Sequence, residues 1–184
     1  MYKSYLRIFT AAIIVALGGR ASSALAITDL TACGPITAPG VYRLVKNLTA
    51  QGNCFVFKAN NIELDLNGHR IQGNGTGAGV FDNFDFNKRL SGIRVHDGVI
   101  SNFDVGVSLP LTTQGEAFRL RVHHNRIGLS VNTVQIDESL VVKNVTGIEG
   151  TGAIIFNNVI NSNQGDGVYA VSYTHLTLPT NREV

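Results

Sequence analysis

Helix-forming patterns are scarce in this chain beyond residue 26. Few stretches repeat apolar residues at the period of about 3.6 residues that an amphipathic helix requires, and Gly, Asn, Val, Ile and Thr are abundant instead. Short runs that alternate apolar and polar residues recur in place of helices. We therefore expect an all-β fold.

Positive charge is also sparse once the N-terminal segment is set aside. The 184-residue chain carries 15 Lys and Arg against 13 Asp and Glu, but Lys3, Arg7 and Arg20 lie in that segment. The remainder has 12 basic and 13 acidic residues, a formal charge of −1. Such a surface lacks the positive field that holds a phosphate backbone, so nucleic acid is not an expected partner.

A long apolar run is missing as well. Residues 8–19 are apolar but shorter than the roughly 20 residues that a membrane-spanning helix needs. Lys3 and Arg7 flank this run on one side, and the small residues Ala24 and Ala26 follow it. The pattern predicts a secretory signal peptide over residues 1–26, with an uncleaved membrane anchor as the alternative. We expect a secreted, periplasmic or cell-surface protein.

Cysteine is nearly absent, since only Cys33 and Cys54 are present. Two thiols without a nearby pair of histidines do not complete a tetrahedral metal site. An exported protein meets an oxidising compartment, so the expected role of the two residues is a disulfide. The loop that it closes would make this bond worth roughly 3 kcal/mol.

What the chain does contain is a series of short alternating runs with a regular spacing. The runs lie at residues 62–66, 93–96, 118–123, 134–137 and 154–157. Each has the length and alternation of a strand with one face buried. The spacing of the runs predicts how these strands are arranged.

Asn125, Asn144 and Asn163 stand 19 residues apart, and the first two are followed three residues later by Gly128 and Gly147. A period near 20 residues predicts a repeat architecture, in which each coil buries its apolar residues against the next. We predict a right-handed parallel β-helix, since parallel crossovers favour the right hand. An antiparallel sandwich is the alternative, but hairpins do not by themselves impose this interval.

The repeated asparagines have a structural explanation. Asn tolerates the left-handed backbone region that sharp corners require, and stacked Asn side chains can hydrogen-bond along a column. We expect these roles for Asn125, Asn144 and Asn163, and for Asn102, which precedes Gly106 in the same manner.

The repeats divide the chain into four parts. After the signal peptide, residues 27–54 are expected to form an N-terminal cap and first coil, and residues 55–170 the β-helix. Residues 81–90 and 109–117 interrupt the pattern and are interpreted as insertions, which serve either binding or simple coverage of the flank. Residues 171–184 lack glycine and resemble translated adapter sequence, which indicates a non-native tail on a truncated protein.

Several of these segments carry a resemblance to a known family. They are Cys33-Gly34, residues 40–44 (Gly-Val-Tyr-Arg-Leu), residues 62–69 (Ile-Glu-Leu-Asp-Leu-Asn-Gly-His) and the later coils that end in Asn-x-x-Gly-aliphatic. Residues 33–170 resemble the pectate-lyase-like superfamily of right-handed parallel β-helix proteins. The resemblance implies a polysaccharide lyase, a glycoside hydrolase, an epimerase or an exported protein without activity, because fold alone does not fix function.

Strand alternation predicts which side chains face outward, where family members that cleave acidic polysaccharides place their catalytic groups. The outward positions are Glu63, Asp65, Arg94, His96, Arg119, Arg121, His123, Gln135 and Asp137. Outward residues must also be polar to keep the sheet soluble, so charge pairs without a function are the alternative.

Five of these residues are the candidate catalytic group. With the coils aligned so that Leu66, Val95 and Val122 stack, Asp65, Arg94 and Arg121 form one column, and His96 and His123 lie in the next. Guanidinium groups can grip a carboxylate with two hydrogen bonds, and a histidine can act as a general base near neutral pH.

No metal site is expected from the residues. Asp82 and Asp85 are a close acidic pair, but one pair is too few for the six to eight oxygens that calcium takes. His123 and His124 are expected to point to opposite strand faces and to chelate poorly. Calcium enters only as a cofactor that the family resemblance implies.

Two functions follow as hypotheses. The first is an exported β-helix protein that binds or cleaves a polysaccharide, which the resemblance suggests is acidic. The second is a non-catalytic extracellular solenoid for adhesion or glycan binding. The residues leave both open, together with the oligomeric state.

Overall fold

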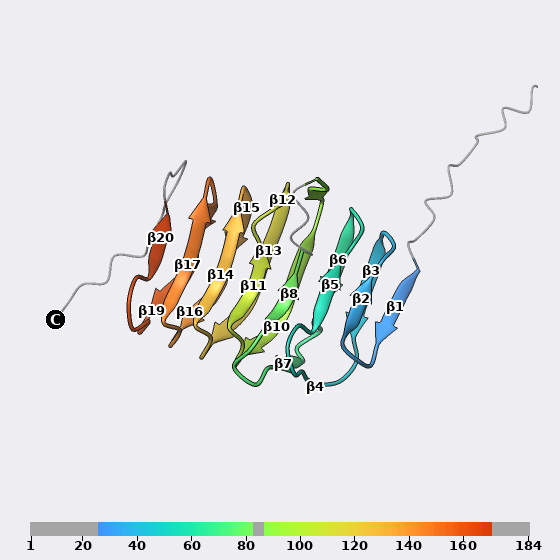
Figure 1. The fold of residues 1–184 in the computed structure, drawn as a ribbon, viewed down its shortest axis with the longest axis horizontal. Helices are drawn as coiled ribbons and strands as arrows, with labels where there is room; N and C mark the ends of the chain where they lie inside the picture. The colour runs from blue at the N-terminus through green and yellow to red at the C-terminus, as the bar shows by residue number, and fades with distance from the viewer. Residues whose placement is uncertain (1–25, 83–86, 171–184) are drawn as a thin grey trace, which may run out of the picture.

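The computed structural model describes residues 26–82 and 87–170, and within them every regular element is a strand (Figure 1). All strand pairs in these ranges are parallel, and the chain winds into a solenoid of about six turns. The predicted parallel solenoid is confirmed, and the antiparallel alternative is wrong. No helix in the described ranges is long and apolar enough to span a bilayer. The predicted signal peptide, except Ala26, and the predicted tail lie outside the described residues.

The strands line three faces of the solenoid. The first face comprises β1 (Ile27–Leu30), β3 (Gly40–Leu44), β6 (Ile62–Asp65), the first halves of β10 (Arg94–Ser101) and β13 (Gly115–His123), β15 (Val134–Asp137) and β18 (Ile154–Phe156). The second face comprises β4 (Leu48–Thr49), β7 (Arg70–Gln72), the second halves of β10 and β13, β16 (Leu140–Val142) and β19 (Val159–Asn161). The third face comprises β2 (Gly34–Ile36), β5 (Phe55–Phe57), β8 (Ala78–Phe81), β11 (Val105–Leu109), β14 (Ile127–Asn132), β17 (Thr146–Thr151) and β20 (Val168–Ala170).

Corners between the faces are built from single residues in the left-handed backbone region. The first corner, between the first and second faces, stacks Asn67, Asp97, Arg119, Glu138 and Asn157, with φ between 47° and 58°. The second corner, between the second and third faces, stacks Asn102, His124, Lys143 and Ser162, with φ between 54° and 59°. Non-glycine residues adopt this region infrequently, so its recurrence in successive coils indicates that the stacking of the coils imposes it.

Inward side chains from successive coils form continuous apolar columns, as predicted. One column under the first face contains Leu64, Val95, Ala117, Ile136 and Ile155, each at most 1% exposed. Because neighbouring parallel strands are about 4.8 Å apart, each of these side chains rests directly on the next. This stacking is the main apolar burial that holds the coils together.

The asparagine ladder is confirmed, but its link to left-handed backbone is wrong for three of the four residues. The Asn125 amide group donates to Oδ1 of Asn144 (3.1 Å), and that of Asn144 donates to Oδ1 of Asn163 (3.2 Å). None of these three has a positive φ. The ladder ends at Phe103, whose backbone N–H donates to Asn125, while Asn102 takes the left-handed corner position.

Two further predictions concern the connections. The Cys33–Cys54 disulfide is confirmed. The proposed insertion at residues 109–117 is wrong, because Leu109 and Leu111 are buried and β12 (Thr112–Thr113) pairs with β9 (Leu90–Ser91). This segment is therefore part of its coil. Residues 83–86, in the other proposed insertion, lie outside the described residues.

Candidate functional site

The strand register separates the five candidate catalytic residues into two groups. Arg94 lies opposite Glu63 and Glu116, and His96 lies opposite Asp65. The predicted column of Asp65, Arg94 and Arg121 is therefore wrong. Asp65, Arg94 and His96 share the first face, whereas Arg121 and His123 lie past the first corner on the second face.

The error in register has a physical cause. Strand β10 runs from the first face to the second, and Asp97 at the corner has a φ of 58°. Arg119 does the same in β13, with a φ of 49°. One left-handed residue turns the strand and interrupts the inward–outward alternation, so the pattern on one face does not set the alignment on the next. The Asp97-Gly98 dipeptide is a turn signal that marks this corner in the sequence.

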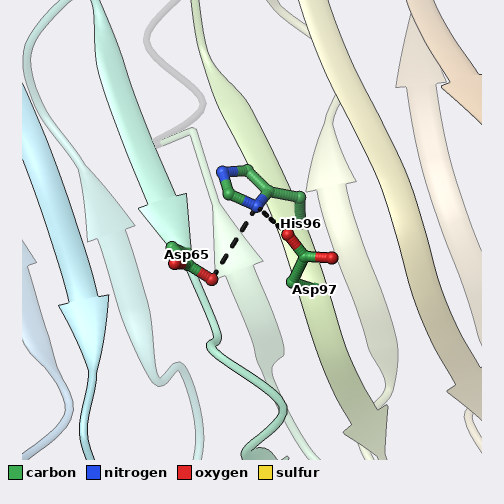
Figure 2. A group of neighbouring side chains, drawn as sticks. All are labelled: Asp65, His96 and Asp97. Atoms are coloured by element: carbon green, nitrogen blue, oxygen red, sulfur yellow. Dashed lines mark hydrogen bonds and ion pairs between the residues drawn. The ribbon is translucent and has the colours of Figure 1, made fainter.

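On the first face, His96 is enclosed by carboxylates. Its side chain is only 8% exposed, and its Nδ1 lies 2.7 Å from Oδ2 of Asp97 and 3.8 Å from Oδ1 of Asp65 (Figure 2). Its Nε2 lies 3.4 Å from Oε1 of Glu63. The ring also stacks on Phe118, with centroids 4.6 Å apart. Both ring nitrogens thus face protein carboxylates, which leaves neither of them directed at a substrate.

Two arginines complete the network around His96. Arg94 bridges Glu63 and Glu116 at 3.0 and 2.8 Å, and Arg119 holds both oxygens of Asp97 at 2.6 and 2.7 Å. The Arg119 hydrogen bond is the main cause that lowers the pKa of Asp97 to about 2, against the opposing effect of burial. Since these side chains remain partly exposed, each ion pair stabilises the fold by at most about 1 kcal/mol. We refer to these residues as the first-face network.

Asp65, His96 and Asp97 are also the described residues that could hold a metal ion. One ligand atom from each lies within 4.8 Å of the others (Figure 2). The set does not fit calcium, which takes six to eight oxygen ligands, because it offers an imidazole and two carboxylates, one of them held by Arg119. A nitrogen and two oxygens would suit a transition ion better.

The second face carries an open groove of about 790 Å³ beside the first corner. It is lined by Gly68, Asp97, Gly98, Val99, Arg119, Leu120, Arg121, Glu138, Ser139, Leu140, Asn157 and Val159. Apolar side chains from successive coils, such as Val99, Leu140 and Val159, line it together with polar side chains. This groove was not predicted from the sequence, because the second face was not recognised as a separate face.

Two arginines of the second face have no acidic partner within the part of the chain that the structure describes. Arg70 and Arg121 both flank Val99 in the register of β7, β10 and β13. Among the described residues, no carboxylate lies within 4.0 Å of either guanidinium, whereas Arg43, Arg94, Arg119 and Arg126 each pair with one. The second face therefore presents unpaired positive charge next to the groove.

His123 and His124 extend this basic region towards the second corner. The Nδ1 atoms of the two rings are 2.6 Å apart, so the prediction that they point to opposite faces is wrong. Burial is the largest cause that lowers the pKa of His123, followed by the neighbouring charges of His124, Arg121, Arg70 and Lys143. The imidazole of His123 is thus favoured in its neutral form.

Comparison with known proteins adds no closer assignment. No family model, curated protein or solved structure matches this chain. The solenoid fold agrees with the resemblance to parallel β-helix proteins, and membership of the pectate-lyase-like superfamily stays a prediction.

Proposed function

We propose that this protein is an exported solenoid that binds an acidic polysaccharide along its second face. The observation that carries the proposal is the position of Arg121, which lines the groove without a carboxylate partner among the described residues. A buried or paired arginine would serve the fold, as Arg119 does with Asp97. An unpaired arginine at a groove is available to a ligand instead.

Arg121 gives the groove a group that suits the carboxylate of an acidic sugar. A guanidinium group forms two parallel hydrogen bonds with a carboxylate, and charged hydrogen bonds of this kind are shorter and stronger than neutral ones. Val99, Leu140 and Val159 offer an apolar floor for the C–H faces of sugar rings. Asn157, which is exposed, adds an amide group for sugar hydroxyls.

The direction of the groove also suits a linear polymer. The groove residues come from successive coils, since β10, β13, β16 and β19 lie side by side. Equivalent side chains therefore repeat along the solenoid axis about every 4.8 Å. Solenoids commonly use such repeated surfaces for extended ligands.

Export is supported by the sequence pattern and by the disulfide. The N-terminal pattern predicts a signal peptide, and Cys33 and Cys54 are bonded to each other. Structural disulfides are typical of secreted, periplasmic and cell-surface proteins. An acidic polysaccharide of a cell wall or matrix would be met in such a compartment.

Binding is proposed rather than cleavage because of His96. A general base needs a nitrogen within reach of the substrate proton, but both nitrogens of His96 face carboxylates. His123 lies two residues after Arg121 on the second face. If turnover were found, His123 would be the candidate general base to substitute.

Binding and turnover can be measured together. The protein is titrated with polygalacturonate and with alginate, with neutral dextran as the control, with and without calcium. Unsaturated products are followed by ultraviolet absorbance, and new reducing ends are measured in the same samples. We expect saturable binding of at least one acidic polymer, no binding of dextran and no product. Equal affinity for dextran, or no binding of either acidic polymer, would contradict the proposal, and product release would replace binding with cleavage.

A further inference from the structure

His123 and His124 form a close pair that the proposed binding does not by itself explain. Their rings meet nearly at right angles, with an interplanar angle of 83° and centroids 4.9 Å apart. The pair exists because His124 occupies the left-handed position of the second corner, with a φ of 57°. The turn of the backbone returns its ring to the side of His123.

The short distance between the rings fixes where protons can sit. Two nitrogen lone pairs do not face each other at 2.6 Å, so one Nδ1 must carry a proton and donate it to the other. A second proton can bind to the Nε2 of the donor ring. That ring then becomes an imidazolium and its hydrogen bond to the neutral ring becomes charge-assisted and stronger. The pair can therefore take up one proton without losing its contact.

The charged groups that act on His123 oppose this proton. They are Arg121 on the same strand, Arg70 on β7 and Lys143 directly after β16, and all are cationic. The residues in register with His123 are uncharged, Ser101 on β10 and Val142 on β16. Burial and these charges lower the pKa of His123, so without a ligand its imidazole is favoured in the neutral form. A carboxylate placed among these groups would reverse the balance, because an opposite charge favours the protonated form.

We propose that His123, His124 and Arg121 form a carboxylate-binding subsite that takes up a proton together with an acidic sugar residue. The subsite presupposes the proposed function, since Arg121 also lines the groove. The group recognised at this subsite is a uronate carboxylate, and the affinity for it depends on pH. Binding tightens as the solution becomes more acidic, because protonated and liganded states favour each other.

A transition metal ion is the rival occupant of a close histidine pair, since imidazole is a common metal ligand. The electrostatics favour an anion. Arg121, Arg70 and Lys143 all raise the local potential, which repels a divalent cation and attracts a carboxylate.

The test is calorimetric titration with polygalacturonate at constant ionic strength between about pH 8 and about pH 5.5, repeated in buffers of different ionisation enthalpy to count protons. If the ligand raises the pKa of the pair by about one unit, affinity increases by up to about tenfold over this range and binding is accompanied by net proton uptake. His124→Gln removes the shared proton while keeping a polar side chain, and we expect its pH dependence to fall below twofold. His69→Gln, which leaves the pair intact, is the matched control and should keep the full dependence.

The outcomes separate this inference from the proposed function. Binding that is independent of pH in the unaltered protein overturns the subsite and leaves the proposed function standing, whereas no binding at any pH overturns both. Full pH dependence in both His124→Gln and His123→Gln also overturns it. Zinc alone is titrated in parallel, and one-to-one zinc binding lost in His124→Gln together with pH-independent glycan binding would assign the pair to a metal. Because proton uptake is counted on the unaltered protein, the test does not depend on any variant folding.

Discussion

The first and second faces share two long strands, β10 and β13, yet their charged residues have different partners. On the first face, Arg94 pairs with Glu63 and Glu116 from the neighbouring coils. On the second face, the residue in register with both Arg70 and Arg121 is Val99, which carries no charge. Alternation places polar residues outward on both faces. The residue opposite in the next coil decides whether a charge serves the fold or is left for a ligand.

The contrast has an energetic side. The first-face network gathers ion pairs around the nearly buried His96, so removing a member leaves a partner with an unmet hydrogen bond. Arg121 on the second face makes no ion pair among the described residues, so its removal should cost the fold little. Variants of the two faces should therefore separate stability from binding.

The largest expected effect is on stability, in His96→Ala. Loss of the imidazole ring removes the stacking on Phe118 and leaves Asp97 and Glu63 without their contact to it. We expect the free energy of unfolding to fall by about 2–3 kcal/mol, measured by urea denaturation. Affinity for polygalacturonate should stay within twofold. Unchanged stability together with lost binding would reverse the roles of the two faces.

The next effect is on binding, in Arg121→Ala. Loss of a charged hydrogen bond to the ligand should weaken polygalacturonate binding at least tenfold, or about 1.4 kcal/mol, with little change in thermal stability. Arg43→Ala is the control, because Arg43 pairs with Asp29 on the first face. Its affinity should change by less than twofold, and equal losses in the two variants would show only a loss of general charge.

A smaller effect concerns stability and pH. The folded protein lowers the pKa of His123 from its ordinary value of 6.5. Such a group contributes stability that is present above pH 6.5 and is lost as the pH falls through the lower folded pKa. Without glycan, acidification from about pH 7.5 to about pH 5 should therefore lower the free energy of unfolding through this residue. His123→Gln should show a correspondingly flatter profile, and an unchanged pH profile in that variant would contradict the assignment.

The smallest expected effect is that of calcium. Because Arg119 and His96 already bind Asp97, calcium should find no complete ligand set on the first face. Millimolar calcium or a chelator should shift the melting temperature by less than about 1 °C. A saturable rise in melting temperature with calcium, abolished in Asp65→Asn, would show that the network serves a cation instead.

The sequence was sufficient to predict the solenoid, the strand runs and the disulfide. The interval of 19 residues between Asn125, Asn144 and Asn163 reflects a ladder that requires one asparagine in each coil. Alternation identified the outward residues, such as Glu63 and Arg94, because each stretch of strand on one face keeps a strict period of two.

The grouping of the site residues could not be predicted, because it depends on the corners. Asp97 and Arg119 turn β10 and β13 with a single residue each, and nothing in an arginine favours the left-handed region. His124 and Lys143 likewise occupy corner positions that the pattern assigned to the asparagines. The register in which the coils stack determines which residues lie at the corners. Alternation within one strand contains no information about this register.

The most direct test of the difference between the faces is an NMR titration of isotopically labelled protein with a polygalacturonate oligosaccharide. The account predicts saturable shift changes at backbone amides of the second face, such as Val99, Arg121 and Leu140, while those of Glu63 and Arg94 stay in place. Shift changes centred on Glu63 and Arg94, with the groove unaffected, would contradict it.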